Sequence, residues 1–397
     1  MATRTISNTG GNWGDTSTWA EGAVPTSSDD VVATSSSGNL VVNVNGACNS
    51  FNMTNYTGTL SGTGYIRLSI AASTTKVFKL VAGMTVTWTG ELQVQGLSST
   101  AGTCQLTSAG KTINSIEVNP LINNTLITME LQDNLTVTND ITHINGTFKT
   151  NNYNITCRSM AFGKFTGKSM TLTLGTSTIN LSGSTSPVEA TNYVLDCYFN
   201  NLPISTLSST TATINLSGQG AGCHFANKTF GGTINYTGGG TNGYYGGGTS
   251  GNINYTGTAS PANYFEIDAA TTVGTGKTWN INGNASNRVT LRSVSTRKAI
   301  TATGTLSLTN QNISNIDITK TSGTLAVTGG TITNSTASGG ATFNAIDAID
   351  GGGNSGWNFL STTLSMSTYS DMGISEYGGL EVVSGGDITR IRVIRFR

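Results

Sequence analysis

The sequence predicts an all-β protein, and within that class a parallel β-helix, in which the chain winds into a solenoid of stacked coils. One short phrase carries most of this prediction. It occurs as T-I-N-L-S-G at 178–183 and 213–218, as T-I-N-Y-T-G at 233–238, and as N-I-N-Y-T-G at 252–257. The starts are 35, 20 and 19 residues apart, and a strand that recurs at such a period is typical of stacked repeat architectures.

The composition favours strands over helices and disorder. Charged residues make up 10% of the 397 residues, against about 25% in ordinary globular chains. Disorder needs high net charge or abundant Pro, whereas this chain has a formal net charge of zero and 5 prolines. Its polar residues are mainly Thr, Ser and Asn, and their alternation with apolar residues is typical of strands. No long segment has the i, i+3, i+4 apolar spacing of a helix.

Charge and hydropathy exclude several classes of partner. The 20 basic residues balance the 20 acidic ones, so we expect no nucleic-acid partner, because phosphate binding needs a basic surplus. No run of 18 apolar residues occurs, which predicts no membrane span, and the N-terminus lacks the apolar region of a secretory signal. The 5 cysteines are scattered without a C-x-x-C pair. We therefore expect buried thiols in a protein made in a reducing cytosol, with no metal site and no cofactor.

Residues 1–24 are predicted to form an N-terminal cap or attachment segment. Trp13 and Trp19 lie six positions apart in a Gly-rich polar stretch. The first coil of a solenoid has no neighbour to cover its apolar interior, and two indoles can cover it. The alternative interpretation is an indole pair that stacks on a sugar.

Residues 25–359 are predicted to form the β-helix itself. Short apolar alternations follow one another from 39 to about 160, between Gly, Asn, Ser and Thr clusters that indicate turns. Sandwiches and barrels have similar strand spacing, but their strands have no reason to repeat at 19 residues. In the middle we interpret 193–204 as a coil with a lateral loop, and Gly238–Gly251 as a tight, permissive turn.

Residues 360–397 are predicted to form a small C-terminal β unit with at least two strands, for trimerisation or docking. The densest charge cluster of the chain ends this unit and consists of Arg390, Arg392, Arg395 and Arg397. Four acidic residues between 371 and 387 balance these arginines. We therefore favour ion pairs between subunits, or docking to an acidic patch of a partner, over nucleic-acid binding.

Both ends of the predicted solenoid resemble a known group of proteins. N-W-G-D-T-S-T-W-A-E-G-A-V-P-T-S-S-D-D-V-V at 12–32 resembles the N-terminal motif of many bacterial and phage right-handed parallel β-helix proteins. G-G-G-N-S-G-W-N-F at 351–359 is similar to the C-terminal motif of the same group. The resemblance covers roughly thirty residues and implies a right-handed solenoid in a surface, secreted or virion component. Phage fibres and spikes of this group are commonly homotrimers.

The candidate catalytic pair of the sequence is Glu266 and Asp268, in Y-F-E-I-D at 264–268. Strand alternation places Tyr264, Glu266 and Asp268 on one face, about 6.5–7 Å apart at successive positions. A glycosidase needs two carboxyl groups at about 5–9 Å. The competing interpretation is a solvated outer face above a core of Phe265 and Ile267.

Other catalytic patterns are absent from the sequence. The two histidines, His143 and His224, lie 81 positions apart, with no nucleophile pattern near either. There is no H-E-x-x-H, G-x-S-x-G, P-loop or dinucleotide motif. The sequence therefore predicts no metal site, and it offers no active site beyond the candidate pair.

The function that we expect is a non-enzymatic phage virion structural protein: a fibre, spike or decoration protein of the head or tail. It would be a homotrimer that contacts other virion proteins, assembled in the host cytoplasm, because the missing secretory signal argues against a secreted protein. The alternatives are a polysaccharide-degrading tailspike, acting as a glycosidase through Glu266 and Asp268, and an adhesin that binds a host surface glycan.

Overall fold

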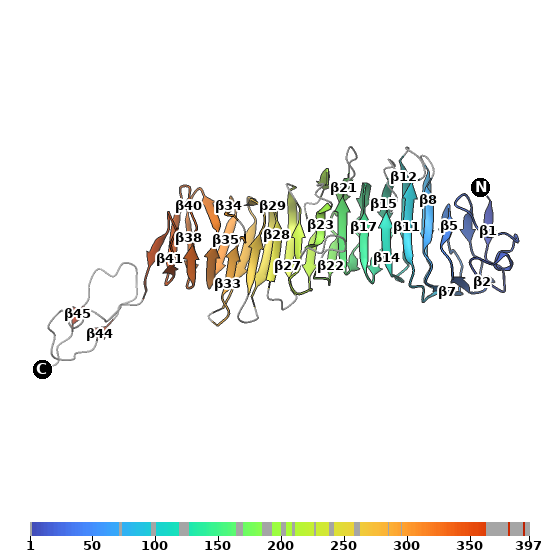
Figure 1. Ribbon diagram of the computed structural model, residues 1–397, viewed down its shortest axis with the longest axis horizontal. Helices are drawn as coiled ribbons and strands as arrows, with labels where there is room; N and C mark the ends of the chain where they lie inside the picture. The colour runs from blue at the N-terminus through green and yellow to red at the C-terminus, as the bar shows by residue number, and fades with distance from the viewer. Residues whose placement is uncertain are drawn as a thin grey trace.

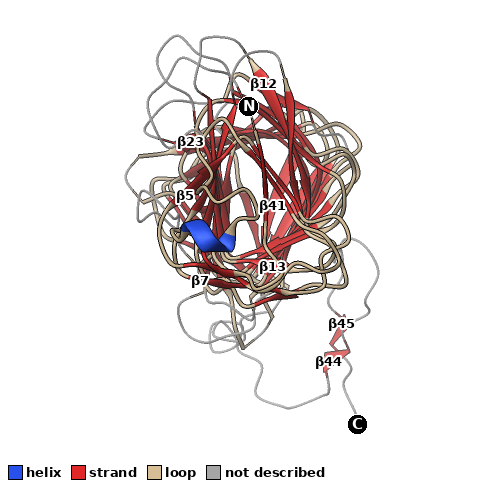
Figure 2. Ribbon diagram, turned by 90° about the vertical axis from the view of Figure 1, so that its right-hand side faces the viewer, coloured by secondary structure: helices blue, strands red, loops and turns tan. Residues whose placement is uncertain are grey.

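The chain forms a parallel β-helix, which confirms the predicted fold class (Figure 1). The computed structural model describes residues 2–362 except 71–73, 97–100, 119–126, 164–169, 185–192, 200–203, 209–210, 226–227, 238–241, 258–262, 285 and 295, together with the strand residues 380–381 and 392–393. Strands stack side by side along the long axis, and the view down this axis shows them surrounding one interior (Figure 2). Within the described residues the only helical element is a 3-10 turn, η1 (Thr16–Thr18).

Strands of one coil pair in parallel with their counterparts in the coils before and after, so the walls of the solenoid are parallel sheets that run along its axis. The 9-stranded sheet contains β1 (Thr3–Thr5), β3 (Asp30–Val32), β6 (Ser50–Asn52), β9 (Thr75–Lys79), β12 (Gly102–Thr107), β15 (Ile127–Leu131), β18 (Gly146–Lys149), β21 (Met170–Thr173) and β24 (Thr206–Ser208). A 4-stranded sheet contains β2 (Gly11–Asn12), β4 (Leu40–Val42), β7 (Thr59–Gly62) and β10 (Thr85–Val86).

The 14-stranded sheet is the longest unbranched wall. It contains β5 (Gly46–Cys48), β8 (Ile66–Ile70), β11 (Glu91–Gly96), β14 (Ser115–Val118), β17 (Asp140–His143), β20 (Ser159–Gly163), β23 (Tyr193–Phe199), β26 (Gly222–His224), β28 (Asn242–Gly246), β30 (Tyr264–Ile267), β33 (Val289–Arg292), β36 (Gln311–Ser314), β39 (Thr331–Thr333) and β42 (Ile349–Asp350).

The 16-stranded sheet has a main path and a short branch. The main path contains β13 (Thr112–Ile113), β16 (Leu135–Val137), β19 (Ile155–Cys157), β22 (Thr178–Leu181), β25 (Thr213–Leu216), β27 (Phe230–Tyr236), β29 (Gly248–Thr256), β32 (Thr278–Asn282), β35 (Thr305–Thr309), β38 (Thr324–Thr328), β41 (Thr342–Ile346) and β43 (Asn358–Leu360). The branch contains β31 (Thr271–Val273), β34 (Lys298–Ala302), β37 (Ile316–Lys320) and β40 (Ala337–Ser338).

The repeated phrase marks four neighbouring coils. Its copies form β22, β25, β27 and β29, and they pair in parallel with identical positions aligned, as in Ile214 with Ile234 and Asn215 with Asn235. Because side chains alternate along a strand, Ile214 points inward and is fully buried, whereas Asn215 lies on the outer face. The repeat therefore measures one turn of the solenoid.

The structure tests the two expectations for the middle of the chain, at 238–251 and at 193–204. Most of the glycine-rich stretch 238–251 is not a turn, because residues 242–246 and 248–256 form β28 and β29, joined at Gly247 with a φ of 55°. The segment from 193, which we interpreted as a coil with a lateral loop, begins with the seven-residue strand β23. Its Val194, Leu195 and Cys197 are fully buried, so this strand belongs to the wall of the solenoid.

Tryptophans lie at both ends of the solenoid. Trp13 and Trp19 are 1% and 2% exposed, meet edge to face at 5.2 Å, and are joined by a hydrogen bond from the Trp19 indole to the Trp13 carbonyl. Strand pairing already begins at Thr3 in β1, so the segment 1–24 contributes strands to the first coil. At the other end Trp357 packs edge to face on Phe343 at 5.7 Å.

The predicted C-terminal unit is described only at two strands. These are β44 (Leu380–Glu381) and β45 (Arg392–Val393), which pair in the antiparallel sense, unlike the parallel strands of the solenoid. The rest of 363–397 lies outside the described residues.

Candidate functional site

The outer face of the 14-stranded sheet gathers aromatic and ionisable side chains over five coils, from β23 to β33. We call this group the tyrosine–carboxylate cluster, and it consists of Tyr193, Asp196, His224, Tyr244, Tyr264, Glu266, Asp268 and Arg292. The parallel register aligns Asp196 with His224, and Glu266 with both Tyr244 and Arg292. In a chain with only 10% charged residues, such a concentration is a candidate for function.

Strand alternation on β30 places the predicted carboxylate Glu266 in this cluster. Phe265 and Ile267 point inward and are fully buried, whereas Tyr264 and Glu266 lie on the outer face. The guanidinium of Arg292 donates two hydrogen bonds to one oxygen of Glu266, at 3.1 and 3.0 Å. It also lies 3.5 Å from the centre of the Tyr264 ring. Glu266 is therefore held in an ion pair that an aromatic ring supports from one side.

The second predicted carboxylate, Asp268, follows β30 and is exposed. The hydroxyl of Tyr193 donates a hydrogen bond of 2.5 Å to it, across the two intervening strands. Burial, reinforced by the negative charge of Asp268, raises the pKa of Tyr193 far above its ordinary value. The phenol therefore stays protonated and acts as a hydrogen-bond donor over the whole physiological range.

A histidine–aspartate pair lies at the buried side of the cluster. The Nδ1 atom of His224 lies 3.5 Å from Oδ1 of Asp196, with 14% and 1% of the two side chains exposed. The Tyr193 ring covers the imidazole at a centroid distance of 4.8 Å. On the other side, a Cβ added to Gly246 would lie 2.2 Å from Cδ2 of His224. The imidazole therefore needs a glycine at position 246.

Both predicted carboxylates are engaged in hydrogen bonds within the cluster. A glycosidase needs one carboxylic acid that donates a proton to the leaving group. Both predicted carboxylates instead accept hydrogen bonds from Arg292 and Tyr193. Together with the partly exposed guanidinium, they offer hydrogen bonds to hydroxyl groups of a ligand. The neighbouring Tyr244 and Tyr264 rings meet at 5.6 Å, and their hydroxyls also contact each other.

Five members of the cluster were not predicted as site residues: Tyr193, Asp196, His224, Tyr244 and Arg292. They come from four different strands, β23, β26, β28 and β33, and Tyr193 is 75 positions from Asp268. The register between β23 and β26 also shifts between Tyr193 and Leu195. Two glycines, Gly222 against the Cβ and backbone of Tyr244 and Gly246 against the His224 ring, leave a signal in the sequence, but they resemble turn residues there.

The remaining predicted residues lie elsewhere. Trp13 and Trp19 are buried at the N-terminal end and present no open ring face to a sugar. Arg392 lies in β45 opposite Glu381, and Arg390, Arg395 and Arg397 lie outside the described residues. His143 is fully buried inside the solenoid.

The cysteines lie in the interior, as the sequence predicts for structural thiols. All five cysteines are free and buried, and burial raises the pKa of Cys104 to about 12. Over the described residues no group of His, Cys, Asp and Glu has the arrangement of a metal site. In the same part of the chain no helix is long and apolar enough to cross a membrane.

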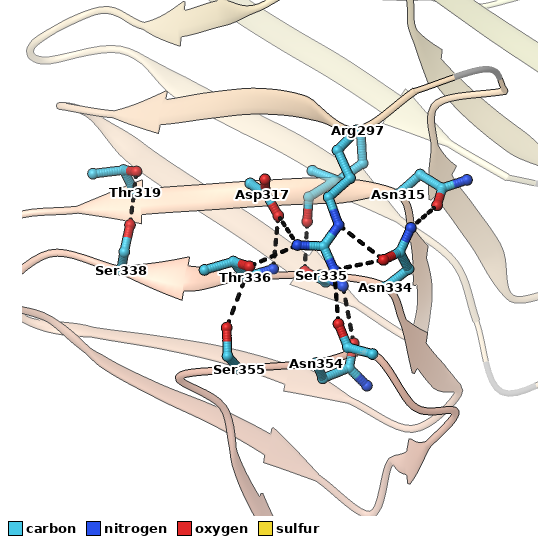
Figure 3. Close-up of polar contacts among 12 residues, drawn as sticks. Arg297, Asn315, Asp317, Thr319, Asn334, Ser335, Thr336, Ser338, Asn354 and Ser355 are labelled. Carbon is cyan, nitrogen blue, oxygen red and sulfur yellow. Dashed lines mark hydrogen bonds and ion pairs between the residues drawn. The ribbon is translucent and has the colours of Figure 1, made fainter.

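A second polar network surrounds Arg297, on the branch of the 16-stranded sheet (Figure 3). Its guanidinium donates to Oδ1 of Asn334 and Oγ1 of Thr336, at 2.9 and 2.8 Å, and lies 3.3 Å from Asp317. It also donates to the carbonyl of Gly353 at 2.7 Å, so one side chain joins successive coils. Because its donors are engaged within the chain, we assign Arg297 a structural role.

Comparison with known proteins returned no match: neither a protein-family model, nor a curated protein, nor a solved structure matches this chain.

Proposed function

We propose that the protein is a non-enzymatic structural component of a phage virion, namely a fibre, spike or decoration protein of the head or tail. The observation that carries this proposal is the unbroken stack of parallel coils from β1 to β43. At about 4.8 Å per strand, the 14-stranded sheet alone gives a rod on the order of 65 Å long. Such a rod sets a distance between its two ends, which is what a fibre or spike provides.

Two further features support this role. The motifs at 12–32 and 351–359, which resemble those of phage β-helix proteins, lie at the two ends of the stack. The side chains of the outer walls are joined from coil to coil by uncharged hydrogen bonds, as in the ladder from Asn180 to Asn280. In this proposal the chain is a homotrimer, assembles in the host cytoplasm and contacts other virion proteins.

Electron microscopy of purified virions tests this proposal. Antibodies raised against the full-length chain and carrying gold should label one defined position on each particle, on the head or on the tail. Antibodies against an unrelated β-helix protein serve as the control. A chain that is found only in the soluble fraction of the lysate, with unlabelled particles, would contradict the proposal.

The second candidate function is recognition or cleavage of a host surface glycan at the tyrosine–carboxylate cluster. It is favoured by one observation, the placement of Asp268, Glu266 and Arg292 on a partly exposed face beside Tyr264. Full-length protein incubated with host capsule or lipopolysaccharide should release oligosaccharides if it is a glycosidase, and only bind if it is an adhesin. Release that persists in the Glu266→Gln, Asp268→Asn double variant would rule out these catalytic residues.

A further inference from the structure

Two walls of the solenoid differ sharply in charge. From β22 to β43, the nine strands on the main path of the 16-stranded sheet contain no Asp, Glu, Lys or Arg. The 14-stranded sheet carries ionisable side chains along much of its length, from Arg67 on β8 to Arg292 on β33. We call the outer surface of those nine strands the uncharged face.

The side chains of the uncharged face form parallel rows along the rod. One row consists of Thr178, Thr213, Thr233, Asn252, Thr278, Thr305, Thr324 and Thr342. The row beside it begins with Asn180, Asn215, Asn235, Asn254 and Asn280. In this second row each amide donates to the preceding one, at 2.8, 2.9, 2.8 and 3.0 Å.

This ladder lowers the free-energy cost of burying the uncharged face under another protein surface. A primary amide has two donors and two acceptor lone pairs, so one bond on each side leaves part of its capacity for a partner. Ordering a flexible side chain on binding costs about 0.5–1.5 kcal/mol, and these amides are already ordered. Taking an uncharged amide or hydroxyl out of water is also far less costly than taking out an ion.

The size of the face suits a protein interface. Nine strands at about 4.8 Å, each about four residues wide at about 3.3 Å per residue, give on the order of 600 Å² before side-chain relief is added. A standard interface buries about 800 Å² on each partner, and its core is depleted in charged residues. The composition therefore fits contact with another protein surface, and the area corresponds to the low end of the range for specific interfaces, about 1,200 Å² over both partners.

We propose that the uncharged face is the surface through which copies of this chain contact one another in the proposed trimer. This inference rests on the trimer in the proposed function. We assign the partner surface to a second copy of the chain, because the rows repeat once per coil and a second copy carries rows of the same period. Copies related by an axis parallel to the rod lie at equal height, and their rows keep the same period along the whole contact. The charged 14-stranded sheet is left facing solvent.

Light scattering of the full-length chain tests the proposal. The wild-type mass should be near three times the 41.0 kDa of one chain. The Thr213→Lys, Thr305→Lys double variant places two cations on the uncharged face, and its mass should fall to that of one chain. The Thr142→Lys, Thr290→Lys double variant places the same groups on the outer face of the 14-stranded sheet and should remain trimeric.

Cross-linking provides a second measurement that does not introduce charge. All five native cysteines are buried, so a single surface cysteine is the accessible thiol. With a short bismaleimide, Thr305→Cys should give cross-linked chains on a denaturing gel, and the matched Thr290→Cys should not.

The outcomes separate this inference from the proposed function. A trimer that persists in the Thr213→Lys, Thr305→Lys variant, without cross-links through Thr305→Cys, overturns the interface and leaves the trimeric virion protein standing. A monomeric wild-type chain overturns both the interface and the trimer, and leaves the face for a partner of another class. The position of the chain in the virion is decided by microscopy in either case.

Discussion

His143 is an ionisable residue buried in the apolar interior of the solenoid. It lies on β17, in register with Val118 and Phe162 of the neighbouring coils, and like them it is fully buried. Its Nε2 atom lies 2.8 Å from the carbonyl oxygen of Asn145. Burial lowers the pKa of His143 to about 4, because the interior disfavours the charged imidazolium. The side chain therefore occupies the core as a neutral ring.

We expect the His143→Leu variant to lose part of the acid sensitivity of the fold. Between the ordinary value of 6.5 and about 4, the unfolded chain binds a proton at this residue that the folded chain does not. The free energy of unfolding therefore falls as the pH is lowered through this window, by about 3 kcal/mol in total. Thermal midpoints at about pH 7 and pH 4.5 should drop further in the wild type than in the variant. An equal drop in both chains would contradict a neutral buried imidazole.

At the scale of elements, each strand is held by its counterparts in the coils before and after it. Backbone pairing supplies the repeat, and side-chain ladders add lateral bonds of the kind seen from Asn180 to Asn280. Where the coils become shorter toward the C-terminus, the Arg297 network joins strands that the regular ladder no longer reaches (Figure 3). The stability of one strand therefore depends on its two neighbours.

The position of an asparagine in the ladder should determine the effect of removing it. Asn235 makes two ladder bonds, with Asn215 and Asn254, whereas Asn280 makes one, with Asn254. At about 1 kcal/mol for each hydrogen bond, Asn235→Ala should lower the free energy of unfolding by about 2 kcal/mol and Asn280→Ala by about half as much. Both residues lie on the uncharged face, so any effect of the substitution on association of the chains should be the same in the two variants. Equal losses, measured by denaturant titration, would show that the ladder bonds contribute nothing specific.

At the scale of the whole molecule, the solenoid is a rod with different walls and closed ends. Its contacts are local along the axis, since each coil touches mainly its neighbours. The buried indoles of Trp13 and Trp19 at one end and Trp357 at the other separate the interior from solvent. The number of coils therefore sets the length of the molecule, and the surface chemistry differs from one wall to the next.

We expect the rod to keep the same length when the chain associates. The stack should measure on the order of 70 Å, from about 4.8 Å per coil, in monomer and oligomer alike, because the proposed contact is side by side. Negative-stain images of the purified protein would give this length directly, and the Thr213→Lys, Thr305→Lys variant should give thinner rods of equal length. Particles with lengths in multiples of 70 Å would instead indicate end-to-end contact.

The tyrosine–carboxylate cluster could be predicted only in part from the sequence. The alternation of Y-F-E-I-D was enough to place Tyr264 and Glu266 outward and Phe265 inward. The partners of these residues, Tyr193 and Arg292, could not be predicted, because they depend on how many residues each intervening coil contains. The interval from Tyr193 to Asp268 includes coils of unequal length and a shifted register, and neither has a signature in local sequence.

The sequence alone determined the fold class, because a repeated phrase with alternating apolar residues can bury its inner side only by stacking on its own copies. It also determined the lack of charge on the wall that this phrase builds, since T-I-N-L-S-G contains none. Tertiary structure decided which walls adjoin, which side chains meet across several coils, and that Gly246 serves the His224 ring. The physical reason is that inward or outward placement is a local property of a strand. Contact between coils depends instead on register, which accumulates over every residue between them.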